Sequence, residues 1–487
     1  MVHSVLSALL AVTLGGPAPV ASADTKAPQI PVIIQTSEVA SLLYFAEAVV
    51  DVPGHTSILK DIYGRHALAD TLLVSGIREA FESVTELRFY ERQKNLPRER
   101  KFLQNVTDLL EIAAAQSHDL DDFGRRTVGL LPRGMSSRLM RGLRALEPIH
   151  RDYVWKPSLD LLMKDEQALN AVAETINAGA LLGRIAAFLG SAWPPGEPVT
   201  IVLVPVPPPY VSHTNFAHCA NAYGFVEVLE NDDMANRYGT LIHEIVHSLY
   251  HAQSLELQRS FEQWFAGNKS PAAPLAYKLI GEGLATAIGN GHVTTLVKGT
   301  PREQWYSDPF IDGFGKALYP LVKEYLEKGR TLDAAFVGQA ISLFASRFPN
   351  LDRRPNAMFK DLVLIVDGQF DLSTIANTVA TKVEVQKLQR SAPTEHPKTM
   401  ASYERAKDMN CLFVVARENL DQLGAYPFAP EVIPRLKQGP TKPFYLAVKV
   451  ADRTHVFLVI GSKEASIEAV GDLVGRPELV MDQVTTL

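Results

Sequence analysis

The sequence is poor in cysteine, with only Cys219 and Cys411 among its 487 residues. Small disulfide-stabilised domains carry many more cysteines for their length, so this class of scaffold is excluded. In an oxidising compartment the two thiols could pair and tie the middle of the chain to its end. They could equally be two separate buried thiols, because 191 residues lie between them and sequence distance does not decide the matter.

Long apolar runs and an excess of one charge are also absent. The mean hydropathy is +0.00, and no segment beyond the N-terminus approaches the about 20 consecutive apolar residues of a transmembrane helix. The chain has 48 Lys and Arg against 54 Asp and Glu, a formal net charge of -6. A mildly acidic chain has no general attraction to nucleic acid or anionic lipid. We therefore expect no nucleic-acid partner and no stable membrane insertion.

The remaining composition is that of a globular protein. Hydrophobic residues make up 46% and charged residues 21% of the chain, which excludes a disordered or collagen-like chain. At about 150 residues per domain the length predicts two or three domains.

The first 23 residues have the pattern of an export signal. Val5–Leu14 is a short apolar run, and Ala21–Ala23 provides the small residues at which a signal peptidase cleaves. No Lys or Arg precedes the run, which is unusual for such a signal, and a disordered apolar N-terminus is the alternative. We expect cleavage near Ala23 and a secreted or periplasmic protein.

The apolar spacing changes along the chain and divides it into regions. Residues 24–195 show apolar residues three and four apart, which predicts helices. Residues 196–350 begin with two β-branched segments and continue as helices, and residues 351–487 mix strands with short helices. The predicted fold class is α+β, mostly helical, with a small mixed sheet. The N-terminal helices are expected over Ser37–Val50, Leu72–Tyr90, Arg100–Gln116 and Gln167–Leu189. The strands are expected over Val199–Val206, Tyr223–Leu229, Leu362–Val366, Cys411–Ala416, Phe444–Val450 and His455–Ile460.

Capping residues predict the helices of the central region. Asn231–Asp233 can cap a helix that runs to about Leu255, and Pro274 suits the first turn of another. Gly289–Gly291 is expected to end that second helix. Two further helices are expected over Pro309–Lys328 and Leu332–Arg347.

The most informative motif is His243-Glu244-Ile245-Val246-His247, in the first of these helices. Since one helical turn rises about 5.4 Å, the side chains of His243 and His247, four residues apart, emerge on the same face of the helix and can bind one ion. Glu244 lies about 100° further round the axis, where it can take a proton from a water molecule activated by zinc. The alternative is a buried helix whose histidines are satisfied core residues. We expect His243 and His247 to be zinc ligands and Glu244 to be a general base.

A catalytic zinc site usually has a third protein ligand. Glu282 is the strongest candidate because it lies between Gly281 and Gly283 on the next predicted helix, and glycine lets helices approach closely. Glu262 and Cys219 are the rival candidates.

The sequence HEIVH followed by Glu282-Gly283-Leu284-Ala285 resembles the gluzincin branch of the zincin metallopeptidases. The pattern is similar to that of the aminopeptidase-N-like and peptidase-MA-like groups, and the resemblance covers roughly residues 223–290. It implies a zincin-like catalytic domain in which His243, His247 and Glu282 bind zinc. It also implies an edge strand, at Tyr223–Leu229, that pairs with the substrate backbone.

The chain departs from that family in three ways. The 34 residues between His247 and Glu282 are more than aminopeptidase-N-like enzymes have. The segment that grips a free N-terminus in those enzymes is not visible, which leaves aminopeptidase specificity unsupported. Thr286 stands where thermolysin-like members often have an acidic residue, so the group that orients the imidazoles is not identified.

Peptide hydrolysis also needs a donor to the oxyanion. Tyr306, Tyr319 and His292 are the candidates in this chain, each of which could instead be structural. The sequence as a whole predicts an exported zinc-dependent peptidase that acts on a peptide or protein substrate. The alternatives are a secreted metal-binding protein with a degenerate site, and a zinc hydrolase of a non-peptide amide or ester.

Overall fold

The structure is a computed structural model that describes residues 29–52, 55–66, 71–84, 88–91, 102–208, 216–230, 232–383, 385, 387–407, 409–450 and 453–487. The expected signal peptide, residues 1–23, lies outside the described residues and stays a prediction. The fold is mixed, predominantly helical, with two larger sheets and one two-stranded ribbon, as the α+β class predicted.

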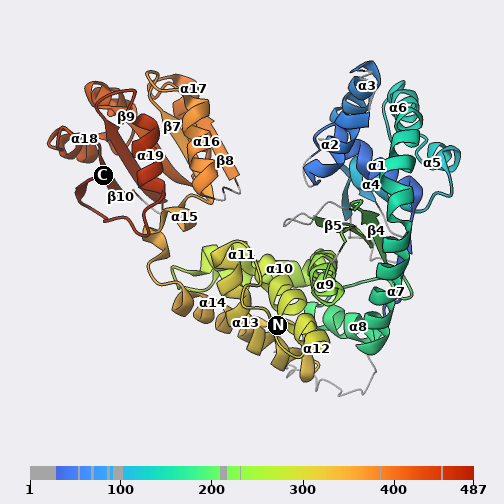
Figure 1. Cartoon of the computed structure of the whole chain (residues 1–487). Helices are drawn as coiled ribbons and strands as arrows, with labels where there is room; N and C mark the ends of the chain where they lie inside the picture. Colours follow the sequence, from blue (N-terminus) through green and yellow to red (C-terminus); the bar gives the residue numbers. More distant parts are fainter. Residues whose placement is uncertain are drawn as a thin grey trace, which may run out of the picture.

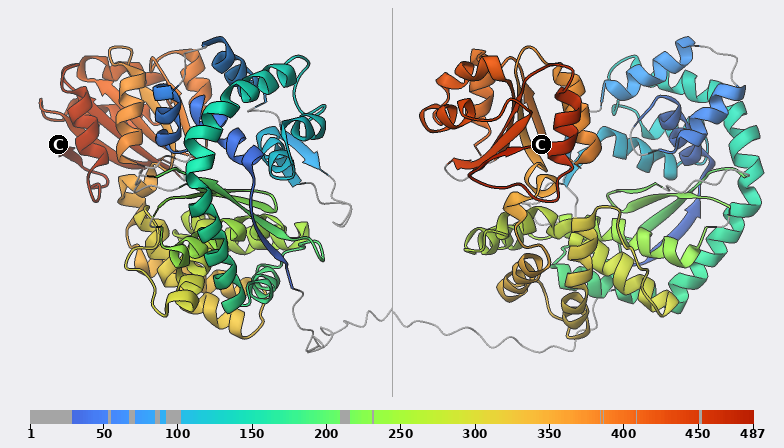
Figure 2. Two further views of the ribbon diagram at one scale, coloured as in Figure 1. Left: turned by 45° about the vertical axis from the view of Figure 1, so that its right-hand side comes forward. Right: turned by 60° about the vertical axis from the view of Figure 1, so that its left-hand side comes forward.

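The first region is a helical lobe (Figure 1). A long helical path leads from this lobe to the central helices along the side of the molecule (Figure 2). This path consists of α6, a π-helical turn, a 3₁₀ turn and α7. The elements of the region are α1 (Glu38–Val49), α2 (Ser57–His66), α3 (Thr71–Glu82), β2 (Arg88–Glu91), β3 (Phe102–Asn105), α4 (Val106–Ala115), α5 (Leu120–Arg126), α6 (Met135–His150), α7 (Leu159–Thr175) and α8 (Ala178–Leu189).

Three of the expected N-terminal helices differ from the observed ones. The helix expected over Leu72–Tyr90 ends at Glu82, and the one expected from Arg100 begins only at Val106. The reason is that β2 and β3 pair as an antiparallel ribbon between them. The helix expected over Gln167–Leu189 is two helices, because Asn177 adopts a left-handed conformation with φ 49 between α7 and α8.

A four-stranded sheet separates the helical lobe from the central helices. Its order is β1 (Val32–Thr36), β4 (Val199–Pro205), β6 (Tyr223–Val228) and β5 (Ala217–Ala220). The first three strands are parallel and β5 runs antiparallel to β6. Successive residues of β4, such as Val202 and Leu203, enter the cores on opposite faces, which is why this strand is apolar apart from Thr200.

The expectation of an edge strand at Tyr223–Leu229 is wrong. β6 pairs with β4 on one side and with β5 on the other. In the part of the chain that the structure describes, β5 pairs only with β6 and forms the edge. The sequence around β5, His218-Cys219-Ala220, has little of the β-branched signal that marks β6.

The central helices follow the sheet as expected. Asp233 caps α9 by accepting a hydrogen bond from the Asn236 backbone N–H at 3.2 Å. The helices over Pro309–Lys328 and Leu332–Arg347 are confirmed within a few residues. The elements are α9 (Met234–His251), α10 (Leu255–Ala266), α11 (Ala273–Ala285), a π-helical segment (Thr286–Val293), α12 (Thr294–Lys298), α13 (Pro309–Glu327) and α14 (Ala334–Arg347).

The expectation that Gly289–Gly291 ends a helix is wrong. The chain stays helical from α11 through the π-helical segment into α12. The glycine is needed for packing, because a Cβ on Gly289 would lie 2.5 Å from the Gly239 carbonyl oxygen and 2.5 Å from the His243 backbone nitrogen. The π-helical segment and α9 therefore cross with their backbones in contact.

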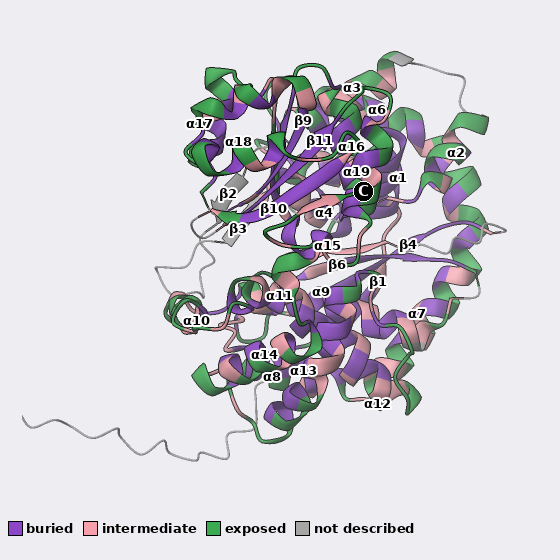
Figure 3. Cartoon of the chain, turned by 90° about the vertical axis from the view of Figure 1, so that its left-hand side faces the viewer, coloured by how far each residue is buried: buried purple, intermediate pink, exposed green. Residues whose placement is uncertain are grey.

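The third region is a layered domain around a six-stranded sheet whose four central strands are mostly buried (Figure 3). The strands expected over 362–366, 411–416, 444–450 and 455–460 are all confirmed. The sheet order is β12-β10-β11-β9-β7-β8, and β11, β9, β7 and β8 are parallel. Helices cover both faces. The elements are α15 (Pro355–Met358), β7 (Asp361–Val366), α16 (Leu372–Lys382), β8 (Lys387–Ser391), α17 (Pro397–Arg405), β9 (Asn410–Ala416), α18 (Ala429–Lys437), β10 (Phe444–Val450), β11 (Arg453–Ile460), α19 (Ser466–Val474) and β12 (Val484–Thr486).

The two cysteines are separate thiols. Cys219 lies on β5 and Cys411 is buried on β9 of the C-terminal domain, and neither forms a disulfide. Among the described residues no single helix is long and apolar enough to cross a membrane.

Gly289→Ala tests the close helix crossing. We expect the new methyl group to lower the melting temperature, because overpacking against backbone costs about 1–3 kcal/mol. Gly338→Ala on α14 is the control, since a Cβ there meets nothing within 4 Å. Thermal unfolding followed by circular dichroism measures both variants, and an unchanged melting temperature in Gly289→Ala would contradict the backbone contact.

Candidate metal centre

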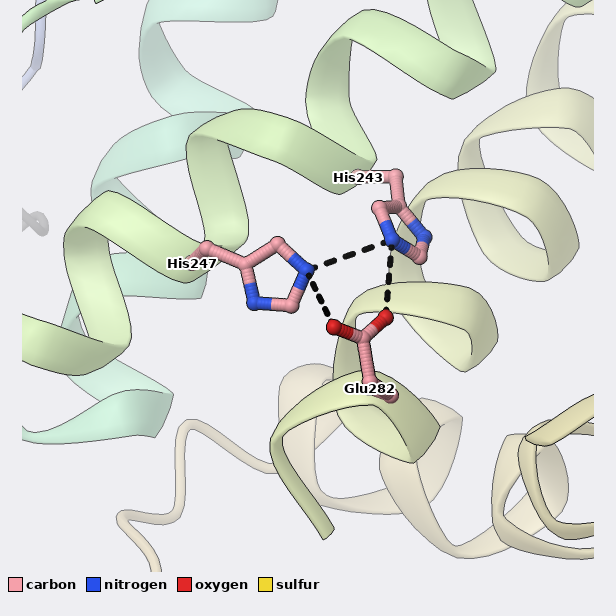
Figure 4. Close-up of side chains that lie close together, drawn as sticks. All are labelled: His243, His247 and Glu282. Carbon is pink, nitrogen blue, oxygen red and sulfur yellow. Dashed lines mark hydrogen bonds and ion pairs between the residues drawn. The ribbon is translucent and has the colours of Figure 1, made fainter. Parts of the chain in front are cut away.

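Three side chains from α9 and α11 converge on one point (Figure 4). The Nε2 atoms of His243 and His247 lie 3.3 Å apart. The Glu282 carboxylate lies 3.4 Å from each of them, with one oxygen nearest each imidazole. Within the described ranges, this is the one group of three or more His, Cys, Asp or Glu side chains with ligand atoms close enough to hold a metal ion.

The separations are compatible with three ligands of one metal ion. Ligands about 2.0–2.2 Å from zinc, at tetrahedral angles, lie about 3.3–3.5 Å from one another. The two imidazole nitrogens have such a separation, 3.3 Å, and each lies 3.4 Å from the nearer Glu282 oxygen, Oε2 for His243 and Oε1 for His247. With one ligand atom taken from each residue, all three atoms lie within 4.8 Å of one another, so a small adjustment of the carboxylate would bring them onto one ion.

Burial and charge also favour a cation between these side chains. His243 is buried, and Oε2 of Glu282 is a buried atom without a hydrogen-bond partner. Burial raises the pKa of Glu282, but the imidazoles of His243 and His247 lower it by more, so that the pKa lies below its ordinary value. The carboxylate is ionised and one of its oxygens has no hydrogen-bond donor, as suits a group that binds a cation.

Asn290 orients the His243 imidazole. Its side-chain amide nitrogen donates to the Trp305 carbonyl oxygen at 2.8 Å, so its Oδ1 accepts the Nδ1–H of His243 at 2.9 Å. This hydrogen bond leaves the lone pair of His243 on Nε2, which faces His247 and Glu282. Asn290 therefore holds His243 in the way that an acidic residue holds a ligand histidine in many zinc sites. Sequence reasoning missed it by treating Gly289–Gly291 as a helix end.

The segment that supports Asn290 also places Tyr306 beside the centre. Asp312 accepts hydrogen bonds from the backbone N–H groups of Trp305 and Tyr306, at 2.7 and 3.2 Å. The Tyr306 ring stacks on His243 with a centroid separation of 5.7 Å and an interplanar angle of 21°. Tyr306 is thus next to a predicted ligand.

Tyr319 and His292 occupy a different place from Tyr306. The Tyr319 ring packs edge-on against Trp305 at 5.5 Å and near His292 at 6.4 Å. These contacts put both residues in the packing behind Trp305, and the expectation that Tyr319 acts at the centre gains no support from its described neighbours.

Glu244 is half-buried on α9, beside the two histidines. Burial raises its pKa, the fields of His243 and His247 lower it, and Glu282 raises it, with a net increase above the ordinary value. A raised carboxyl pKa brings the group closer to neutral pH, where a general base is most effective. Glu244 has the position and the environment for that role.

The rival ligands do not reach the cluster. Glu262 lies on α10, where it accepts a hydrogen bond from the Tyr277 hydroxyl at 3.4 Å. Cys219 lies on β5, and its thiol faces Ser248 and Glu244: burial and the Glu244 carboxylate raise the pKa of this thiol above its ordinary value. Neither belongs to the group of converging ligand atoms.

Comparison of the chain with models of known protein families, with characterised proteins and with solved structures gave no significant match.

Asn290→Ala tests the support of His243. Without the Asn290 acceptor the imidazole loses its fixed tautomer and orientation, and loss of such a partner typically weakens metal affinity about 10- to 100-fold. Competition with a chromophoric zinc chelator measures this affinity. Asn170→Ala on the exposed face of α7 is the control, and equal affinity in both variants would contradict the role of Asn290.

Proposed function

We propose that this protein is an exported zinc-dependent peptidase of the gluzincin type. The observation that carries the proposal is the convergence of His243, His247 and Glu282: the imidazole Nε2 atoms are 3.3 Å apart, and each lies 3.4 Å from one oxygen of the carboxylate. Two imidazoles and a carboxylate form a common ligand set of catalytic zinc. The export signal expected over residues 1–23 supports the extracellular part of the proposal.

The protein side chains would divide the chemistry among them. When bound, zinc supplies Lewis acidity, which makes water acidic near neutral pH and polarises a carbonyl group. Glu244 accepts a proton from the attacking water and passes it to the leaving amine. Tyr306 would donate a hydrogen bond to the oxyanion. Of the candidate donors, it is the one whose ring stacks on a predicted ligand, His243.

The edge of the four-stranded sheet would position the substrate. β5 contributes a strand edge next to α9, and its Cys219 faces Glu244. An extended peptide can add to such an edge through main-chain hydrogen bonds. We therefore assign to β5 the substrate-pairing role that the family resemblance had placed on Tyr223–Leu229.

Glu244→Gln tests the proposed mechanism. The amide keeps the shape of the side chain but cannot accept a proton, so we expect unchanged zinc content and a loss of turnover of at least about 100-fold. Release of a fluorophore from a library of internally quenched peptides measures turnover. Glu262→Gln on α10 is the matched control and should retain activity.

Two results would contradict the mechanism. Equal turnover of Glu244→Gln and the parent protein would exclude Glu244 as the base. Zinc-dependent hydrolysis of simple esters or amides without cleavage of any peptide would replace the peptidase by a different zinc hydrolase.

A further inference from the structure

A second group of buried titratable side chains lies at a cavity of ≈ 540 Å³ between the helical lobe and β5. The cavity is lined by residues of α1, α3 and α4, by the segment between α1 and α2, and by the start of β5. It opens on the face of the sheet opposite to α9, because the His218 ring stacks on Phe225 of the helical-lobe core. The adjacent Cys219 packs into the core that contains α9.

Two imidazole–carboxylate pairs form one side of this cavity. His218 Nε2 lies 2.9 Å from Glu111 Oε1, and His55 Nε2 lies 3.1 Å from Glu47 Oε2. The Glu47 side chain is 1% exposed, and its second oxygen, Oε1, is buried without a hydrogen-bond partner. A buried carboxylate oxygen with no donor is costly, so this atom marks a place for a ligand that donates.

The lining of the cavity carries surplus negative charge. The lining holds five carboxylates, those of Glu47, Asp51, Glu82, Asp108 and Glu111. They outnumber the guanidinium of Arg78 and the two imidazoles, even when both imidazoles are protonated.

The pKa values of the cavity groups reflect this surplus. Burial and the Glu111 carboxylate raise the pKa of Glu47 to about 7. Burial lowers the pKa of His218, but the carboxylates of Glu111 and Glu47 raise it by more, so that the pKa is about 9. The site therefore favours added positive charge and disfavours an anion.

We propose that this cavity binds a cationic alkylammonium or guanidinium group, which donates hydrogen bonds to Glu47 Oε1 and to Glu111. Such a group supplies a hydrogen-bond donor for Glu47 Oε1 and a positive charge that offsets the surplus of carboxylates. A neutral ligand of the same shape would leave the surplus negative charge of the cavity uncompensated and would bind more weakly, even where it can donate a hydrogen bond.

The group could belong to a lysine or arginine side chain of a peptide that pairs with β5, or to a free amine. His218 points into the cavity from the strand whose next residue faces Glu244, so a peptide on β5 would pass both. The link to a basic residue in a substrate rests on the proposed peptidase function, whereas binding of the cation does not.

The test uses the full mature protein carrying Glu244→Gln, so that no ligand is consumed. Isothermal titration calorimetry compares two peptides that are identical except at one position, which holds lysine in one and norleucine in the other. It also compares pentylamine with pentanol. In at least one of these two pairs, we expect the cationic ligand to bind at least tenfold more tightly than its neutral partner. The preference should be lost in Glu47→Gln and kept in Glu174→Gln, an exposed carboxylate on α7.

Glu111→Gln is a second variant, for use if Glu47→Gln melts at a lower temperature than the parent, and it should lose the preference as well. Tight binding of the lysine peptide alone would identify a substrate residue as the source, and equally tight binding of pentylamine would identify a free amine. Equal affinity for the cationic and neutral members of both pairs would overturn the inference. So would an equal loss of preference in Glu47→Gln and Glu174→Gln.

The same titrations separate this inference from the peptidase proposal. If the cationic ligands bind more tightly but the parent protein cleaves no peptide, the cation site stands and the peptidase proposal fails. If the parent protein cleaves peptides but shows no preference for cationic ligands, the peptidase proposal stands and the cation site fails.

Discussion

The backbone contact between α9 and the π-helical segment after α11 is the constraint on which the proposed site depends. Gly239 and Gly289 let these helices approach so closely that a side chain on Gly289 would collide with the His243 backbone. At this separation Glu282, about two helical turns before the contact, faces His243 and His247. Asn290, the residue after Gly289, reaches the far side of His243. One helix crossing thus supplies the predicted third ligand and the group that orients the first predicted ligand.

The edge strand β5 connects the proposed metal centre with the proposed cation site. Successive side chains of a strand point to opposite faces. His218 therefore belongs to the acidic cavity of the helical lobe, while Cys219 faces Glu244 on α9. This arrangement gives the helical lobe a proposed role in ligand selection, which neither its composition nor its helical spacing indicated. The layered C-terminal domain, around β7 to β12, contributes no described residue to either site.

The local elements were predictable where one residue dominates the local energetics. Asp233 caps α9, and the β-branched run of β4 forms a strand buried on both faces. Glu282 was identifiable because a carboxylate between two glycines is unusual in a helix. The role of Asn290 was not, since glycine has the same local signature at a helix end and at a close crossing. The edge position of β5 depends on strand pairing over distance, which the local sequence does not encode.

Zinc binding by the purified mature protein is the most direct test of the metal centre. We expect about one zinc per chain by elemental mass spectrometry, removed by chelators and lost in His243→Ala and His247→Ala. Glu282→Ala should weaken zinc binding measurably, whereas Glu262→Ala, on the neighbouring helix α10, should not. Full zinc retention in either histidine variant, or equal affinity in Glu282→Ala and Glu262→Ala, would contradict the assignment of these three residues as a metal centre.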